Sequence, residues 1–394
     1  MNDVRIGIIG FGNMGQAHAG YMATVKGAKI GAIGDVDDAK RKSAAEKYGV
    51  PTFAHHRELL ASGTCDAVIV ATPHYDHVPV ARDAFEHKLH VMIEKPVAVS
   101  VTAAREINEA AARHPNLRFG IMYNQRTNPL YRKMRDLIAE GELGEVTRVT
   151  WIVTNWFRTW TYYGSGGWRA TWAGEGGGVL INQCPHNLDL LQWITGLMPN
   201  RVTAVGFVGK THPIEVEDEM SAILEYPNGA IGHFVTSTGE APGTNRLEIC
   251  GDRGKMISED GKLTFFRTRA SVSETNKTSS NGFTSPETWK FDIPIHHNSE
   301  MEHKIVTQRF VDVIRQGRPN SDLFAEGTEG VRGLEIGNAM MMSGLNRQPI
   351  TLPMDGAAYD AFLIENATKY GGRKTLTARP AAGAAVDMNA SFGR

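Results

Sequence analysis

Short apolar runs alternate with amphipathic segments along the first third of the chain. Residues 4–9 are rich in valine and isoleucine and fit a buried parallel strand, and residues 16–25 continue with helical character. Further strands are predicted at residues 28–35, 65–72, 89–96 and 117–124, with helices such as those at 78–88 and 101–114 between them. This alternation predicts an α/β fold whose first domain, residues 1–124, is a doubly wound parallel sheet of the Rossmann type.

The pattern changes after residue 124. A helix with a glycine stop is predicted at residues 128–146, and an alternating strand follows at 147–157. Short segments separated by turn signals then predict strands joined as hairpins, at residues 201–209, 217–226, 230–238, 245–251, 254–260 and 262–268. Residues 125–394 are therefore expected to form an α+β domain for substrate binding and oligomerisation, built on a large, mostly antiparallel open sheet.

Three later segments complete the second domain. Residues 268–287 are polar and rich in turn formers, which predicts an excursion or flexible loop. Helices are predicted near residues 300–316 and 326–345, packed back onto this domain. The small, polar tail at residues 378–394 is expected to be disordered unless it docks on a partner subunit.

The composition narrows the class of protein. The chain has 394 residues, 41% hydrophobic and 22% charged, and its net charge of −1 gives no argument for binding nucleic acid or an anionic membrane. Three widely spaced cysteines favour a reducing compartment over a disulfide framework. No apolar run reaches the ~18 residues of a membrane helix and no signal peptide is recognisable, so we expect a cytoplasmic protein. The histidines at 55–56, 296–297 and 303 form no convincing ligand set, and no metal is expected.

A glycine-rich turn follows the first strand at once. Its G-x-G-x-x-G spacing is that of a dinucleotide-binding loop, where glycines permit a tight turn, the approach of a pyrophosphate and close helix–strand packing. The free N–H groups of the next helix then face the phosphates. The predicted cofactor-binding loop consists of Gly10, Phe11, Gly12, Asn13, Met14 and Gly15.

Asp35 ends the second strand, about 20 residues after the last of these glycines, where a carboxylate binds the ribose 2′-hydroxyl. Because a carboxylate repels a 2′-phosphate, NAD is favoured over NADP as the cofactor. Arg41 and Lys42 are close enough in sequence to reach such a phosphate, although a solvated helix face suits them better.

Polar residues follow the later strands, at the sheet edge where doubly wound folds bind ligands. Among them Lys95 carries the most chemistry, because Pro96 holds its backbone extended at a strand end. A lysine becomes a useful base when burial or a neighbouring cation lowers its pKa from ~10.4 to ~7–8, and oxidised nicotinamide is such a cation. The alternative to a catalytic role is that Glu94 and Lys95 form a structural ion pair at the surface.

Four motifs occur in order: GIIGFGNMGQAHA, ATPHYDH, IEKP and GGGVLINQCPHNLDLLQWITG. Over residues 4 to about 350 the chain resembles the glucose–fructose oxidoreductase, inositol dehydrogenase and MocA family of NAD(P)-dependent sugar and cyclitol dehydrogenases. The resemblance implies that the glycine loop cradles the pyrophosphate and that Asp35 holds the adenosine ribose. It also implies a homo-oligomer, a dimer or tetramer, with subunit contacts on one face of the second sheet.

The same resemblance assigns the strand ends. It implies that Thr72, Pro73 and His77 lie near the nicotinamide, that Glu94 binds a ribose, and that Lys95 transfers a proton. The chain departs from the family at two positions. His74 stands where asparagine is frequent, and Asn182 stands where aspartate is usual.

Residues 167–190 combine three adjacent glycines with polar residues in an apolar run. We expect the glycines to let the backbone approach nicotinamide and substrate. On one helix, Asn182 and His186 would share a face, with Asp189 and Trp193 on that side, although Pro185 can kink the first turn. A lone buried histidine is usually a core residue, but beside Lys95 we place His186 in the active site.

Five tryptophans between residues 151 and 172, interleaved with arginines and tyrosines, suit a pyranose ring with its C–H faces and hydroxyl rim. Trp151 is assigned to the core, and Trp168 and Arg169 to the substrate. The predicted substrate-binding residues are Lys95, Asn124, Arg126, Trp168, Arg169, Asn182 and His186.

We therefore expect an NAD-dependent dehydrogenase that oxidises a secondary ring hydroxyl of a sugar, glycoside or cyclitol, with C3 of a glycoside as one possibility. Lys95 and His186 would handle the proton, and Asn182 would only hydrogen-bond a sugar hydroxyl. Two alternatives remain open. One is an NAD-dependent glycosidase or lyase that uses transient oxidation and elimination, and the other is a non-catalytic Rossmann-type sensor.

Overall fold

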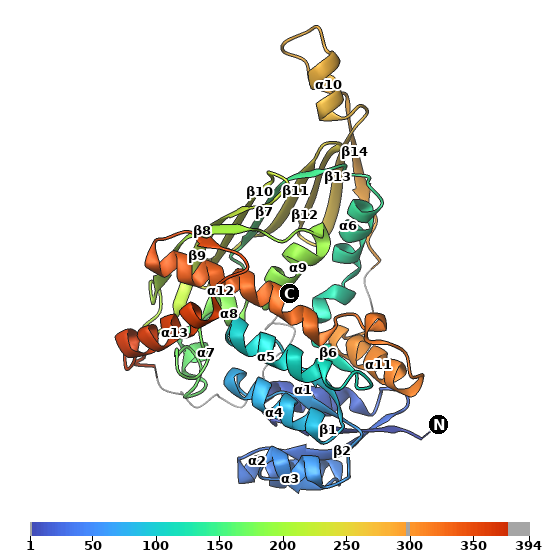
Figure 1. Cartoon of the computed structure of the whole chain (residues 1–394), viewed down its shortest axis with the longest axis vertical. Helices are drawn as coiled ribbons and strands as arrows, with labels where there is room; N and C mark the ends of the chain where they lie inside the picture. The colour runs from blue at the N-terminus through green and yellow to red at the C-terminus, as the bar shows by residue number, and fades with distance from the viewer. Residues whose placement is uncertain (1, 297–299, 377–394) are drawn as a thin grey trace.

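A six-stranded parallel sheet forms the N-terminal part of the molecule, at the bottom of Figure 1. The computed structural model describes residues 2–296 and 300–376. The strand order β3-β2-β1-β4-β5-β6 is the doubly wound order, which confirms the predicted fold class. The strands are β1 (Val4–Ile9), β2 (Ala28–Gly34), β3 (Thr52–Phe53), β4 (Ala67–Val70), β5 (His90–Ile93) and β6 (Phe119–Ile121).

Helices cover both faces of this sheet, which is why β4 is apolar and buried at every position. Val70 belongs to the core cluster that contains Phe85, whereas Ile69 belongs to the cluster that contains Phe310. The helices of this part are α1 (Asn13–Met22), α2 (Asp38–Tyr48), α3 (His56–Ala61), α4 (His77–Glu86), α5 (Val101–Ala112) and α11 (Glu302–Arg315).

The last of these helices comes from the C-terminal part of the chain. The sequence predicted α11 closely, but placed it on the second domain, and that placement is wrong. Its apolar stripe, with Val306, Phe310 and Val311, is buried in one cluster with Val4 and Ile6 of β1. The Rossmann sheet is thus completed by residues from beyond position 300, and the predicted boundary at residue 124 stays a prediction.

A nine-stranded sheet forms the second part and is antiparallel except where β10 pairs with β7. This is the mostly antiparallel open sheet that the hairpin pattern predicts. In sheet order, its strands are β14 (Thr288–Ile293), β13 (Lys262–Thr268), β12 (Gly254–Glu259), β11 (Asn245–Gly251), β7 (Val146–Val153), β10 (Ile231–Ser237), β9 (Glu217–Glu225), β8 (Arg201–Val208) and β15 (Ile350–Thr351).

Helices lie between the two sheets in Figure 1, where α9 and α12 pack against each other. The helix α12 matches the prediction for residues 326–345, whereas α13 was not predicted. The helices of this part are α6 (Pro129–Ala139), α7 (Trp160–Gly164), α8 (Val179–Asn182), α9 (Pro185–Thr195), α10 (Val272–Thr278), α12 (Gly330–Asn346) and α13 (Gly356–Tyr370).

Residues 268–287 form an excursion at the end of the sheet, as predicted, but they are not merely a loop. The short helix α10 lies within the excursion, which projects away from the body between β13 and β14 (Figure 1). Ser271 caps this helix by accepting a hydrogen bond from the backbone of Glu274, a local signal that the turn-rich composition concealed. The tail at residues 378–394 lies outside the described residues.

The nine-stranded sheet buries one face and exposes the other. Val205 and Phe207 of β8, Ile223 of β9 and Ile231 of β10 are between 43% and 48% exposed on neighbouring strands. Side chains of this size are usually buried in a monomer. The expectation that one sheet face carries subunit contacts stays a prediction, and the exposed face with these four side chains is the face to which it refers.

Candidate active site

The glycine loop between β1 and α1 is shaped for an approaching anion. Gly10 has φ +90°, and a Cβ on Gly15 would lie 1.9 Å from the carbonyl oxygen of Gly10, so both glycines are needed by the turn itself. Gly12 differs, because a Cβ there would meet nothing within 4 Å. It is the N-cap of α1 and offers no side chain to the first N–H groups, which are left for a ligand.

Asp35 lies directly beside this loop. Its carboxylate accepts hydrogen bonds from the backbone N–H groups of Phe11 (2.7 Å) and Asp37 (2.8 Å). The guanidinium of Arg41 donates to the carbonyl oxygens of Asp35 and Val36, so it is folded back onto the strand end. A fixed carboxylate next to an open glycine loop fits NAD, and these residues would hold its pyrophosphate and adenosine ribose.

Of the residues after β4, Thr72 has a side chain that is available to a ligand, whereas His77 is bonded within the protein. The hydroxyl oxygen of Thr72 is buried without a hydrogen-bond partner among the described residues, at the edge where nicotinamide is expected. The ring nitrogens of His77 instead lie 2.7 Å and 2.9 Å from the carbonyl oxygens of Pro96 and Thr72. His77 therefore joins the two loops, and its predicted cofactor role stays a prediction.

Glu94 is buried at the end of β5 in a hydrogen-bonded pair with His18, at 2.7 Å. Burial by itself raises the pKa of Glu94, but the bond to His18 and nearby positive charges outweigh it and lower the pKa to about 2. The second carboxylate oxygen accepts the backbone N–H of Lys95. The alternative of a surface ion pair between Glu94 and Lys95 is wrong, because the carboxylate is buried and occupied by a histidine.

Lys95 points across the domain junction. Its ammonium nitrogen donates to the main-chain oxygen of Asn182 at 3.0 Å. Burial lowers the pKa of Lys95, and the charge of Arg169 lowers it further, while Glu94 and Glu175 act in the opposite direction. The net downward shift is the change that a lysine needs to act as a base near neutral pH.

His186 lies at the start of α9 with 4% of its surface exposed. Neither ring nitrogen has a hydrogen-bond partner among the described residues, and the ring packs edge-on against Tyr123. Burial, followed by the charge of Lys95, lowers the pKa of His186 well below its usual range. Buried polar atoms are nearly always paired, so this neutral ring is expected to find its partner in a ligand.

The segment that carries these residues is two helices rather than one. The first helix, α8, ends at Asn182, and α9 begins at Pro185, which occupies the first turn where its missing N–H costs nothing. The predicted common face of Asn182 and His186 is therefore wrong, although the predicted kink is present. Asp189 also turns elsewhere, toward Arg126.

The three adjacent glycines serve packing within the protein. A Cβ on Gly176 would lie 2.0 Å from the side chain of Val99, and one on Gly178 would lie 1.9 Å from the main-chain oxygen of Glu217. We expected the backbone of the three glycines to approach nicotinamide or substrate. That expectation is wrong for Gly176 and Gly178, because protein atoms occupy the space beside them.

The side chain of Asn182 belongs to a partly buried polar network around the buried carboxylate of Glu175. Its amide nitrogen donates to the carboxylate of Glu175, and its amide oxygen accepts from the hydroxyl of Tyr162 at 3.1 Å. Arg169 donates to the same hydroxyl at 2.7 Å and lies 3.6 Å from Glu175. Sequence reasoning missed Glu175, and the only available signal was a lone acid before the glycines.

Two predicted substrate residues behave differently from expectation. The guanidinium of Arg126 binds both carboxylate oxygens of Asp189, at 2.8 Å and 2.6 Å, and also binds Glu329, so its donors are used within the protein. Asn124 donates to Glu302 at 3.2 Å but keeps a buried oxygen without a partner among the described residues. We assign Arg126 to structure, and the role of Asn124 stays a prediction.

Trp168 and Arg169 lie together beside the residues that follow β4. The ring of Trp168 packs edge-on against His74 at 5.4 Å, and the guanidinium of Arg169 lies 5.0 Å from its centre. His74 in turn contacts the main-chain oxygen of Glu175 at 3.0 Å. Trp151 is fully buried in the core as predicted.

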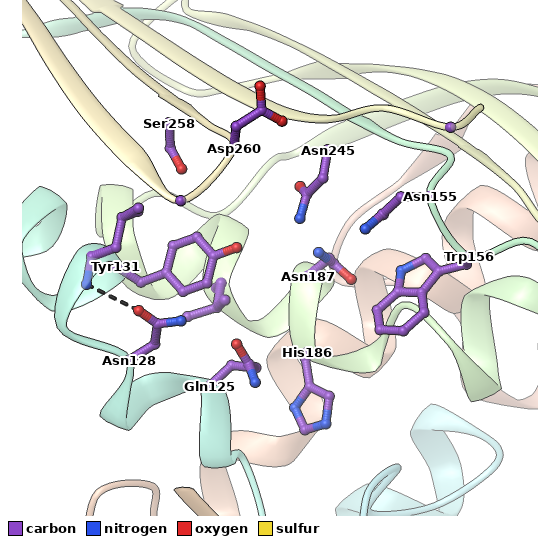
Figure 2. A pocket seen from close by; sticks show the side chains of 14 residues that line it. Gln125, Asn128, Tyr131, Asn155, Trp156, His186, Asn187, Asn245, Ser258 and Asp260 are labelled. Carbon is purple, nitrogen blue, oxygen red and sulfur yellow. Dashed lines mark hydrogen bonds between the residues drawn. The ribbon is translucent and has the colours of Figure 1, made fainter. Parts of the chain in front are cut away.

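A cavity of about 640 Å³ opens from His186 (Figure 2). Side chains from α6, α9 and the strands of the second sheet surround it, as Figure 2 shows. Its lining is dominated by amides and aromatic rings, in particular Gln125, Asn128, Tyr131, Asn155, Trp156, Asn187 and Asn245. His186 was predicted as a site residue, and Trp156 belongs to the tryptophan-rich segment that the sequence linked to a pyranose ring; the other residues of this list were not named as site residues.

Within the described ranges, residues 2–296 and 300–376, no group of three or more histidine, cysteine or acidic residues is arranged to hold a metal ion. Over the same residues, no helix has the length and apolar character to cross a membrane.

Two family models match the chain. The model described as an oxidoreductase family with an NAD-binding Rossmann fold matches residues 4–121, and that described as the GFO/IDH/MocA C-terminal domain matches residues 131–257. Together they span more than half of the chain.

Similar proteins include an uncharacterized oxidoreductase, YrbE, from Bacillus subtilis, 24% identical over 88% of this chain and 96% of its own length. Inositol 2-dehydrogenase from Rubrobacter xylanophilus is 27% identical over 64% of this chain and 70% of its own. Among solved structures, the WlbA dehydrogenase from Bordetella pertussis in complex with NADH and UDP-GlcNAcA has 25% identity and a TM-score of 0.75, covering 90% of this chain and 100% of that one.

Proposed function

Because this chain belongs to the GFO/IDH/MocA family of oxidoreductases and has its NAD-binding Rossmann domain, we propose that it transfers a hydride between NAD and a secondary ring hydroxyl carbon of a sugar or glycoside. The observation that carries the proposal is the pairing of two residues at the domain junction. Lys95 is partly buried and its ammonium group bonds to the segment that leads to His186, whose ring nitrogens both lack partners among the described residues. The inositol dehydrogenase relative supports the substrate class, and the NADH-bound WlbA structure supports the cofactor.

Bound nicotinamide supplies the acceptor for the hydride. Lys95, with its lowered pKa, takes the hydroxyl proton as the carbon is oxidised. His186 is neutral and has two unpartnered nitrogens, so it can accept a hydrogen bond from one substrate hydroxyl and donate to another. The two residues thereby orient the alcohol and move its proton.

Asn182 acts as a positioning residue in this proposal. Its main-chain oxygen holds the ammonium group of Lys95, and its side chain is already bonded to Glu175 and Tyr162. The sequence-based hypothesis gave it a sugar hydroxyl, and we now assign it to fixing the lysine. An aspartate at this position would place a second carboxylate against Glu175, which disfavours ionisation of both.

The test is NADH formation with purified enzyme and a panel of free sugars, cyclitols and glycosides, with NADP as the matched cofactor control. NADH formation with ring-hydroxyl substrates supports the proposal. Glycosides labelled with deuterium at C3 then report the carbon oxidised, because the label reaches NADH only if C3 gives up the hydride. Oxidation at C3 also acidifies the neighbouring C–H, which is what the elimination alternative requires. Release of the aglycone without net NADH would indicate the elimination alternative instead, and NAD binding without either reaction across the panel would leave only the sensor.

A further inference from the structure

The cavity beside His186 is larger than the reacting ring requires. It continues from His186 past α9 to the turn between β12 and β13, where Ser258 and Asp260 line its far end (Figure 2). Its volume of about 640 Å³ lies within the ~300–1,000 Å³ of pockets that enclose a drug-sized ligand. The far half of the cavity is therefore available to a part of the substrate that does not react.

Residues that line the path between the two ends carry polar atoms without partners among the described residues. The amide oxygen of Asn187, a residue only 5% exposed, is buried without a hydrogen-bond partner among the described residues. The same holds for the amide oxygen of Asn155 and the indole nitrogen of Trp156. Figure 2 shows these three side chains grouped on one side of the cavity. Buried polar atoms are rarely left unpaired, so a ligand that pairs these atoms is favoured.

These unpaired atoms match hydroxyl groups better than phosphate. Amide oxygens need a donor and the indole nitrogen needs an acceptor, and a hydroxyl supplies both, whereas a phosphate oxygen only accepts. None of the fourteen described residues that line the cavity is lysine or arginine, and Asp260 contributes a carboxylate. The rings of Tyr131 and Trp156 add flat apolar surface of the kind that C–H faces of a sugar pack against.

We propose that this cavity is a second sugar subsite, so that the enzyme takes a neutral disaccharide or comparable glycoside. The ring to be oxidised lies at His186, and the second ring lies between Asn155, Trp156 and Asn187 and reaches the turn at Asp260. Glycosyl phosphates and nucleotide sugars are excluded, because their charge meets a carboxylate and unpaired carbonyl oxygens with no cation in the lining. The proposal rests on the oxidoreductase function above and names its substrate class.

The experiment measures binding, so that it does not depend on turnover. Enzyme saturated with NADH is titrated with glucose, with the disaccharides cellobiose, maltose, lactose and trehalose, and with glucose 1-phosphate and UDP-glucose, and the dissociation constant is read by calorimetry. We expect at least one neutral disaccharide to bind about tenfold or more tightly than glucose, and the two phosphorylated sugars to bind more weakly than that disaccharide. No gain for any disaccharide, or tighter binding of a phosphorylated sugar, would overturn the proposal.

Variants tie the binding to the subsite. Asn155→Ala should weaken the preferred disaccharide by about three- to tenfold more than it weakens glucose. Asp260→Lys should improve glucose 1-phosphate relative to that disaccharide. Asn276→Ala, on the exposed helix α10, is the matched control and should change neither ratio. A loss in Asn155→Ala that is equal for both sugars would contradict the subsite, whereas intact binding without any NADH formation would count against the proposed reaction alone.

Discussion

Replacing Arg126 by methionine should destabilise the protein severely, since its charge is paired in the interior. Arg126 and Asp189 are each 1% exposed at their side chains and share two hydrogen bonds, at 2.8 Å and 2.6 Å. Without the guanidinium, Asp189 keeps its side-chain bond to Gln192 but loses its counter-charge in a buried position. Breaking a buried pair in this way costs about 3–5 kcal/mol, and we expect Arg126→Met to lower the free energy of unfolding by that amount.

The assay is urea unfolding followed by circular dichroism, with a surface pair as the control. Arg5 and Asp66 lie 2.7 Å apart but are 40% and 41% exposed, so Arg5→Met should cost no more than about 1 kcal/mol. The double variant Arg126→Met with Asp189→Leu should recover much of the loss, because it removes the stranded charge as well. An Arg126→Met enzyme as stable as Arg5→Met, with only its affinity for sugar reduced, would refute this reasoning and restore the substrate role that the sequence suggested.

Three further predictions follow from the site. The variant Glu94→Gln should have a lower free energy of unfolding at neutral pH, because the pKa of Glu94 is about 2 in the folded protein and ~4.3 in the unfolded chain. This loss of stability should fade as the pH drops from about 5 toward 2. A loss that stays constant over a pH series of urea titrations would contradict the prediction. Because the charge of Glu175 raises the pKa of Lys95, Glu175→Gln should move the rising limb of kcat/KM against pH to lower pH, and a shift to higher pH would show the opposite coupling. Asp35→Ala should reduce the preference for NADH over NADPH by about tenfold or more, as measured by fluorescence titration. An unchanged preference would mean that residues other than Asp35 distinguish the two cofactors.

The parallel sheet and its cofactor loop were predictable because their signals are local. The run before Gly10 and the acid at Asp35 each lie within one strand–turn unit, and the structure brings them together at 2.7 Å through the backbone of Phe11. The hairpins β9–β10, β11–β12 and β12–β13 were predictable for the same reason, since a short turn joins the two strands of each. Lys95 was found because a polar residue at the end of a buried parallel strand reaches the ligand edge.

The errors concern contacts between distant parts of the chain. Nothing near Arg126 in the sequence signals that Asp189 will neutralise it, 63 residues later. Likewise, the main-chain oxygen of Glu217 in β9 leaves no room for a side chain at Gly178. The sequence around the glycines could not show this contact, because Glu217 lies far away along the chain. Most of the cavity lining was missed because its residues come from several separate elements, and only the folded sheet places Asn155 near Asn187.

The central claim is that Lys95 takes the proton of the alcohol that is oxidised, and pre-steady-state NADH formation in Lys95→Met tests it most directly. Methionine keeps the unbranched shape of the side chain up to the ε position but lacks the amine, so it cannot accept the proton. We predict that the single-turnover rate with saturating sugar falls by about 100-fold or more, while the affinity for NADH stays close to that of the wild type. A variant that binds NADH normally and forms it at nearly the wild-type rate would contradict the account.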